Sequence, residues 1–269
     1  MIELRDVTLG VGGRALLEEV DARIAAGDFV AVLGRNGAGK TTLLRAIAGL
    51  HPARRGSVLL DGTPIDQLAP LERAKRVAFV TGDEVFLEAL LVRDVVSIGR
   101  YAHHRWWQWN EEPQDEAAIE GALAAVGASR FAQRLFSTLS AGERQRVWIA
   151  LGLAQETPIL LLDEPTSHLD VGAAADILAL LRGLSESGKT IVCALHDVNE
   201  AATYADRIAL LGENRLLALD APPNLLEGPL LQRAYGIAFK RVPALLPTRS
   251  PAASSQPQSP SSQAQSPTS

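Results

Sequence analysis

The sequence has only one cysteine, Cys193, among 269 residues, so it can form neither an internal disulfide nor a zinc site built from several cysteines. Cys193 lies inside the apolar run 190–195, which predicts a buried strand residue. No apolar run approaches the ~20 residues that a membrane-spanning helix needs. Charges at Glu3, Arg5 and Asp6 stand where a secretory signal peptide would be apolar. We therefore expect a soluble chain that is not sent across a membrane.

The sequence also has no excess of basic residues. Its formal net charge is -5, whereas nucleic-acid-binding domains are usually basic, so we expect no nucleic-acid partner. Residues 246–269 have almost no large apolar side chains and are rich in Pro, Ser, Gln, Ala and Thr. This composition predicts a disordered tail after a folded domain over residues 1–245. A proline-rich peptide that binds a partner is the alternative interpretation of the tail.

A glycine-rich turn is the most informative feature that is present. It follows the apolar run 29–33, which predicts a buried strand, and precedes the helical pattern 42–50. Glycines let successive backbone N–H groups turn toward phosphates, Lys40 adds a positive charge, and the Thr41 hydroxyl suits Mg²⁺. We discard a purely structural loop, because a full GxxxxGKT stands between strand and helix. The nucleotide-binding residues of this Walker A loop are Gly34, Arg35, Asn36, Gly37, Ala38, Gly39, Lys40, Thr41 and Thr42.

Two carboxylates follow a second apolar run, residues 159–162. A strand that ends in acids places them at the carboxyl edge of a parallel sheet, where nucleotides bind. Asp163 suits Mg²⁺, and Glu164 suits polarisation of an attacking water. Solvated turn carboxylates are the common alternative, but together with the Walker A loop the pair predicts hydrolysis of a nucleoside triphosphate with Mg²⁺ as cofactor.

The segment 139–146, LSAGERQR, resembles the signature LSGGQ of the ABC-transporter ATPases. In addition, Ser167 and Asp170 resemble the family's D-loop, and His196 after a strand resembles its switch histidine. The resemblance covers the chain to about residue 240. It implies an α/β P-loop NTPase (RecA-like) core with a parallel sheet, an N-terminal antiparallel β subdomain and an inserted helical subdomain over about residues 83–157.

In that family, nucleotide lies between the Walker A loop of one subunit and the signature of the other. The resemblance therefore implies a head-to-tail homodimer, in which hydrolysis removes the bridging contacts. It also implies that His196 contacts the γ-phosphate and holds Glu164 or the water. Ser140 can in addition cap the helix that begins near Gly142. The residues implied to contact nucleotide from the facing subunit are Ser140, Ala141, Gly142, Glu143 and Asp170.

Several positions depart from the family pattern. Val11 stands where an aromatic residue normally stacks on adenine, and Gly82 where a glutamine normally contacts Mg²⁺. We infer either that Asp83 or Glu84 substitutes for the glutamine or that coupling to a partner is altered. The signature has Ala141 for glycine and Glu143 for glutamine. The Ala141 methyl could obstruct a backbone position that needs positive φ.

The segment 92–101 resembles the ATPases of importers for iron-siderophores, haem and vitamin B12. We therefore expect a peripheral ATPase on the cytoplasmic face of the bacterial inner membrane, with permease subunits and an extracytoplasmic solute-binding protein as partners. Residues 99–109 are rich in aromatic and basic side chains, including His103 and His104; adjacent histidines do not easily face one ligand, so partner docking or packing is favoured. A non-transport ABC ATPase and a degenerate regulatory cassette are the alternatives.

Overall fold

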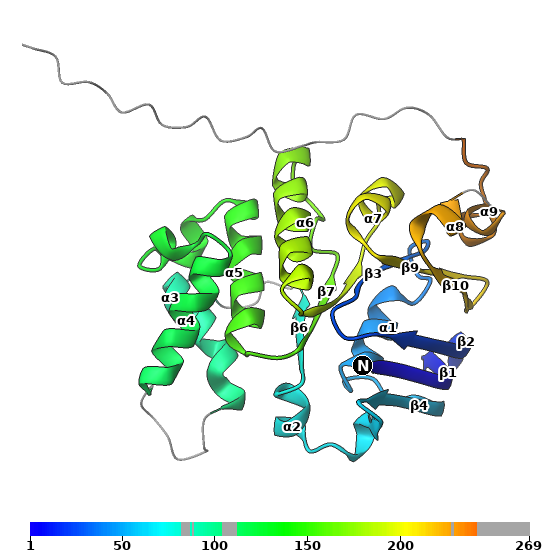
Figure 1. Ribbon diagram of the computed structural model, residues 1–269, viewed down its shortest axis with the longest axis horizontal. Coiled ribbons are helices and arrows are strands. Elements are labelled where there is room, and N and C mark those ends of the chain that lie inside the picture. Colours follow the sequence, from blue (N-terminus) through cyan, green and yellow to red (C-terminus); the bar gives the residue numbers. More distant parts are fainter. Residues whose placement is uncertain (82–86, 88, 104–111, 227–228, 241–269) are drawn as a thin grey trace, which may run out of the picture.

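The computed structural model of the protein describes residues 1–81, 87, 89–103, 112–226 and 229–240. Figure 1 shows two β-sheets beside a group of helices drawn in green, with a further set of helices on the yellow and orange part of the chain. Among the residues described, no helix combines the length and apolar character that crossing a bilayer requires. Three sequence predictions lie outside these residues: the contacts of Gly82, Asp83 and Glu84, the role of His104, and the disordered tail 246–269.

The smaller sheet is antiparallel and opens the chain. Its order is β2-β1-β4-β5, and β1 pairs antiparallel with both β2 and β4. Ile2 and Leu4, and after a register shift Val7 and Leu9, are the apolar residues of β1 that are buried. This confirms the N-terminal antiparallel subdomain. The strands are β1 (Ile2–Val11), β2 (Arg14–Ile24), β4 (Arg55–Leu60) and β5 (Thr63–Pro64).

The larger sheet has the order β10-β9-β3-β8-β7-β6. Every neighbouring pair is parallel except β9 and β10. Because the carboxyl ends of parallel strands share one edge, the loop after β3 and the carboxylates after β7 lie at the same edge. The sequence-predicted parallel core is therefore confirmed. The strands are β3 (Phe29–Leu33), β6 (Val77–Thr81), β7 (Ile159–Asp163), β8 (Thr190–Ala194), β9 (Arg207–Gly212) and β10 (Arg215–Asp220).

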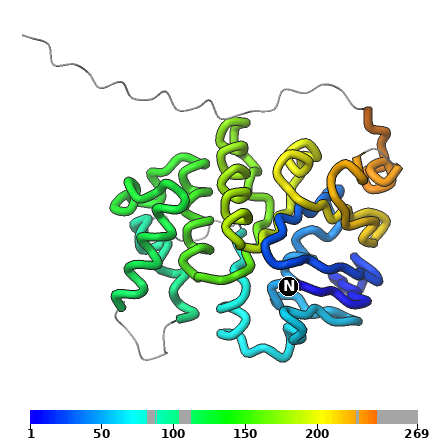
Figure 2. The backbone as a smooth tube through the Cα atoms, viewed as in Figure 1, coloured from blue at the N-terminus to red at the C-terminus, as the bar shows by residue number. Residues whose placement is uncertain are grey.

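A group of helices is inserted between β6 and β7. Figure 2 shows this green segment gathered on the side of the molecule away from the blue strands β1 and β2. The inserted elements are α3 (Val92–Ser97), η2 (Ile98–Ala102), α4 (Pro113–Ala125), η3 (Ser129–Phe131), η4 (Phe136–Thr138) and α5 (Ala141–Ala154). The remaining helices are α1 (Lys40–Ile47), η1 (Ile65–Gln67), α2 (Pro70–Ala74), α6 (Val171–Glu186), α7 (Val198–Tyr204), α8 (Pro222–Leu226) and α9 (Leu230–Tyr235).

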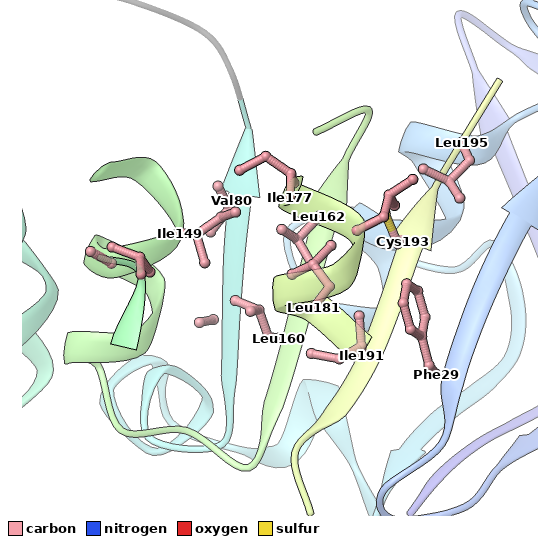
Figure 3. Packing of buried hydrophobic residues seen from close by; sticks show 14 of the residues in the cluster. Phe29, Val80, Ile149, Leu160, Leu162, Ile177, Leu181, Ile191, Cys193 and Leu195 are labelled. Atoms are coloured by element: carbon pink, nitrogen blue, oxygen red, sulfur yellow. The ribbon is translucent and has the colours of Figure 1, made fainter. Parts of the chain in front are cut away.

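Both faces of the parallel sheet are buried, as expected when helices or a second sheet cover each face. On one face, Val30 and Val32 of β3 pack in a core shared with α1 and the small sheet. On the other face, Phe29 of the same strand packs in a core shared with α5 and α6, whose residues Figure 3 shows around Leu162 and Cys193. Cys193 is confirmed as a buried strand residue, and burial raises the pKa of its thiol well above the ordinary value.

For α4, the sequence predicts which residues are buried more accurately than it predicts where the helix begins and ends. The apolar residues Ile119, Leu123 and Val126 recur at helical spacing in the sequence, which predicts a helix over residues 115–128, and all three are buried. However, α4 starts at Pro113 and ends at Ala125. Its start is set by a capping box between Glu112 and Asp115, which satisfies N–H groups that the helix leaves free.

Candidate nucleotide-binding site

The Walker A loop connects β3 to α1 with the geometry that its glycines allow. A Cβ on Gly34 would lie 2.8 Å from the carbonyl oxygen of Leu211, so a side chain there would collide with backbone. Gly39 directly precedes α1 with φ +100°, a conformation that side chains disfavour. The helix begins at Lys40, two residues before the predicted start, because the loop runs straight into its first turn.

The loop forms one wall of a pocket of about 280 Å³. The opposite side carries Glu164 from the end of β7 and His196 from the end of β8, so the structure brings together residues that lie more than 120 positions from the loop in sequence. Of the nine predicted Walker A residues, Gly34, Arg35 and Ala38 do not line the pocket. The Ala38 N–H donates to the Arg35 carbonyl at 3.0 Å in a backbone turn. The lining residues are Leu16, Asn36, Gly37, Gly39, Lys40, Thr41, Thr42, Glu164 and His196.

The charged groups of the pocket are linked to one another. Lys40 is only 5% exposed; its Nζ donates to the carbonyl of Gly34 at 3.3 Å and lies 3.6 Å from Glu164 Oε1. The other carboxylate oxygen of Glu164 is 2.6 Å from His196 Nε2. Burial acts to raise the pKa of Glu164, but the His196 hydrogen bond and the nearby Lys40 charge outweigh it and hold that pKa below its ordinary value. Glu164 is therefore a carboxylate at neutral pH.

Asp163 occupies a different environment from its neighbour. Burial raises its pKa, which the hydrogen bond from Thr41 partly offsets. Its Oδ1 is buried and has no hydrogen-bond partner among the described residues. A buried carboxylate oxygen without a donor, beside a hydroxyl, has the ligand chemistry that Mg²⁺ prefers. In the described part of the chain no group of three acidic, His or Cys residues could hold a metal alone, so the remaining ligands would be phosphate oxygens and water.

The raised pKa of Asp163 predicts a pH-dependent gain in stability for Asp163→Asn. The folded chain holds this proton more tightly than the unfolded chain, so ionised Asp163 destabilises the fold at neutral pH, and the penalty disappears below the unfolded pKa of about 3.9. We expect Asp163→Asn to raise the melting temperature in magnesium-free buffer at pH 7.5 and to have little effect at pH 3, where the carboxyl is protonated in both the folded and the unfolded chain.

Calorimetric melting at several pH values tests this expectation. The exposed Asp66→Asn provides a control with the same change of charge. An increment for Asp163→Asn that persisted unchanged at pH 3 would show that ionisation of this carboxyl is not its cause.

The signature residues lie at the start of α5 and form a complete capping box. Ser140 Oγ accepts a hydrogen bond from the Glu143 N–H at 3.3 Å, and Glu143 Oε2 accepts one from the Ser140 N–H at 3.0 Å. Ala141 is the first residue of α5 and is not among the residues with positive φ. The expected obstruction by its methyl group was therefore wrong, because a helical φ accommodates a side chain. None of residues 140–143 lines the pocket of the same chain.

The D-loop connects to the pocket through Glu164 itself. Glu164 has φ +52°, and its Oε2 accepts a hydrogen bond from Ser167 Oγ at 3.5 Å. Asp170 caps α6 by accepting the Ala173 N–H at 2.8 Å. The structure thus places Ser167, rather than Asp170, against the predicted base, a contact that the sequence reasoning did not identify.

The pocket also includes an apolar residue that the sequence reasoning missed. Leu16, on β2, lines it beside the Walker A loop, whereas Val11, which replaces the family's aromatic residue, is 57% exposed at the end of β1 and does not line it. Leu16 carries no motif; only the pairing of β1 with β2 and the packing of β2 near Gly39 bring it there. His51 lies in the loop after α1, with Nε2 3.0 Å from the Gly10 carbonyl oxygen.

Comparison with known proteins agrees with this site. The ABC transporter family model matches residues 17–167, more than half of the chain. The chain belongs to the ABC transporter family, and it is an ATP-binding transport ATPase, as the signature predicted.

Its similarity to individual relatives extends over most of their length. It is 40% identical over 233 residues to the ferric enterobactin transport ATP-binding protein FepC of Escherichia coli, covering 86% of this chain and 85% of FepC. It is 41% identical over 222 residues to the hemin import ATP-binding protein HmuV of Nocardia farcinica, covering 82% and 76%. The solved dimer of the bacterial ABC transporter cassette MJ0796 superposes with a TM-score of 0.71 at 29% identity, covering 82% of this chain and 99% of that one.

Proposed function

We propose that the chain is the ATP-hydrolysing subunit of an importer that takes up an iron chelate, either a siderophore complex or haem. The names of relatives at about 40% identity support this substrate class, and so does segment 92–101. The further partners we propose are permease subunits in the membrane and, through them, an extracytoplasmic solute-binding protein. On this proposal the chain works at the cytoplasmic face.

One observation carries the proposed ATPase mechanism. Lys40, Glu164 and His196 converge on the Walker A pocket, while residues 140–143 lie outside it. One chain therefore presents two partial sites, and a second copy related by a two-fold axis completes both. The resemblance assigns Ser140 and the N–H of Gly142 to the γ-phosphate of the facing copy, and a dimeric ABC cassette is known from a structure similar to this one.

Each charged group of the pocket has a distinct part in this mechanism. Lys40 binds the β- and γ-phosphate oxygens. Thr41 and Asp163 would hold Mg²⁺, which supplies charge neutralisation to the phosphates. Glu164, kept ionised by its neighbours, accepts a proton from the attacking water. The water oxygen bonds to the γ-phosphorus while the bond from that phosphorus to the β,γ-bridging oxygen breaks, so that ADP leaves with this oxygen and inorganic phosphate is formed. His196 orients that carboxylate through the 2.6 Å contact.

Transport by the assembled complex tests the proposal against its alternatives. The chain is purified with the membrane subunits that accompany it and placed in vesicles, and uptake of a ferric catecholate siderophore and of haemin is measured with and without ATP. We expect ATP-dependent uptake of one of the two, lost on Glu164→Gln.

Two other outcomes would contradict the proposal. Hydrolysis by the chain that membrane subunits neither bind nor alter would indicate a non-transport ABC ATPase. ATP binding without hydrolysis in the full complex would indicate a regulatory cassette.

A further inference from the structure

The side chain of Arg100 is buried at the C-terminal end of α5, the helix that begins with the signature residues. Arg100 is 4% exposed, and its Nε donates to Asp115 Oδ1 on α4 at 2.8 Å. Its Nη1 donates to the carbonyl of Ala154, the last residue of α5, at 2.7 Å, and to Glu156 Oε2 in the following turn at 2.6 Å. One guanidinium therefore joins η2, α4, the end of α5 and the turn that leads into β7. We call this set of contacts the Arg100 clamp.

Gly99 and His103, which lie near Arg100 in η2 and just after it, also contact the C-terminal end of α5. A Cβ on Gly99 would lie 2.3 Å from the Leu151 carbonyl oxygen, so only glycine lets η2 approach the α5 backbone this closely. His103 Nε2 is 2.9 Å from the carbonyl oxygen of Gln155. The last carbonyls of a helix have no partner within it, and here Arg100 and His103 supply partners from η2.

The same turn is tied to the parallel sheet. The side-chain amide of Gln155 donates to the carbonyl of Val77 at 3.2 Å, at the start of β6, and to that of Ala74 at the end of α2. The C-terminal end of α5 is thus fixed to the core on one side and to the inserted helices on the other. Its N-terminal end carries Ser140 and the capping box.

From this arrangement we propose that Arg100 is a positioning residue for ATP hydrolysis. By fixing the C-terminal end of α5, it sets the direction in which the signature residues at the other end point toward the facing copy. The inference rests on the proposed role of Ser140 in that copy. The proposal assigns a role to Gly99 and Arg100, which neither line the nucleotide pocket nor belong to the Walker, signature or D-loop motifs.

Because α5 is long, a small change of tilt at its C-terminal end produces a large displacement of the signature at its N-terminal end. Its 14 residues span about 21 Å, so a tilt of about 5° at the clamped end moves the signature by about 2 Å. A displacement of about 1 Å at a reacting group can lower a rate by about 10²-fold. Small changes at Arg100 should therefore affect turnover without altering the Walker A pocket, to which Arg100 does not contribute.

The contacts of Arg100 need the shape of a guanidinium as well as its charge. Three acceptors on three segments lie around one planar fork, whereas a lysine ammonium is a point charge on a flexible stem. Arg100→Lys keeps the positive charge beside Asp115 but cannot hold the whole set. A second variant, Arg100→Met with Asp115→Asn, keeps similar volumes and leaves no unpaired buried charge.

The test measures turnover, ATP affinity and melting of the full-length chain, over a range of protein concentrations with ATP and Mg²⁺. We expect Arg100→Lys to lower kcat roughly tenfold, and the double variant to lower it further. KM and the calorimetric affinity for ATP should stay within about twofold, because the effect belongs to the transition state. Arg93→Lys is the matched control, since Arg93 also pairs with α4, through Glu116; its kcat should not fall.

Four outcomes would overturn the inference. The first is wild-type kcat in both Arg100 variants. The second is a fall in melting temperature, ATP affinity and kcat together, which would indicate a structural role only. The third is an equal loss of kcat in Arg93→Lys. The fourth is wild-type turnover per chain that does not rise with protein concentration, which would contradict the proposed two-copy site itself and, with it, the inference that depends on it.

Discussion

Replacing Glu164 by glutamine should leave ATP binding intact and lower the rate of hydrolysis roughly 10²-fold or more, the effect of losing a general base. Glutamine has the same shape and can still contact His196 and Ser167, but its amide cannot accept the proton of the attacking water. The expected result is therefore a chain that binds ATP and pairs with a second copy but does not release product.

This prediction has a pH signature as well. Because the pKa of Glu164 lies below its ordinary value, the carboxylate persists through neutral pH. Turnover that depends on it should be lost only as the pH falls below the usual glutamate range, about 4.3. Its contribution to stability, likewise, is present above the unfolded pKa and disappears as the pH falls through the folded one.

Single-turnover hydrolysis and calorimetric titration with ATP measure the two quantities separately. Glu200→Gln is a suitable control, since Glu200 is also a half-buried carboxylate, hydrogen-bonded by Thr166 at 3.1 Å, yet does not line the pocket. Near-normal hydrolysis by Glu164→Gln would remove Glu164 from the role of base.

Replacing Lys40 by methionine should weaken ATP binding itself by roughly 10- to 100-fold, the equivalent of about 1.5 to 3 kcal/mol for a hydrogen bond to a charged group. Methionine preserves much of the buried stem but not the ammonium group, which is already held in place by Gly34 and Glu164. This preorganisation is the reason for a large loss, because the intact chain spends little entropy in ordering the group.

A comparison of nucleotides makes the measurement specific to phosphate. Titration calorimetry with AMP, which lacks the β- and γ-phosphates, should give nearly the same affinity for Lys40→Met and the unaltered chain, while ATP affinity falls. The exposed Lys75→Met provides the control for loss of one positive charge. Equal ATP affinities in Lys40→Met and the unaltered chain would contradict the proposed contact.

Strands and helices that are marked by a short run of neighbouring residues could be predicted from the sequence. The run Phe29–Leu33 is a strand over the predicted range, because both of its faces are buried and every residue is apolar. The position of Glu164 at the same sheet edge as the Walker A loop followed from the prediction of a parallel sheet, since parallel strands share a carboxyl edge.

Contacts made across the fold carried no comparable signal. Leu16 reaches the pocket through the packing of β2, and Ser167 contacts Glu164 in a turn where Glu164 has φ +52°. The conformation of Ala141 was misjudged for a related reason. The capping box starts the helix at this residue, one residue before the predicted start near Gly142, so Ala141 has a helical φ and not the positive φ that we expected.

Ser140 is both a residue of the signature and the N-cap of α5, and this double role limits which substitutions the position tolerates. Loss of the Ser140 hydroxyl removes both a proposed phosphate contact and a cap, and a missing cap costs about 1 kcal/mol. Threonine, aspartate and asparagine preserve the cap, so they form the narrow set of replacements through which this position can drift while the chain stays folded. In related chains that have lost ATPase activity, this position should therefore still carry serine, threonine, aspartate or asparagine, because the helix cap is needed even where the phosphate contact is not.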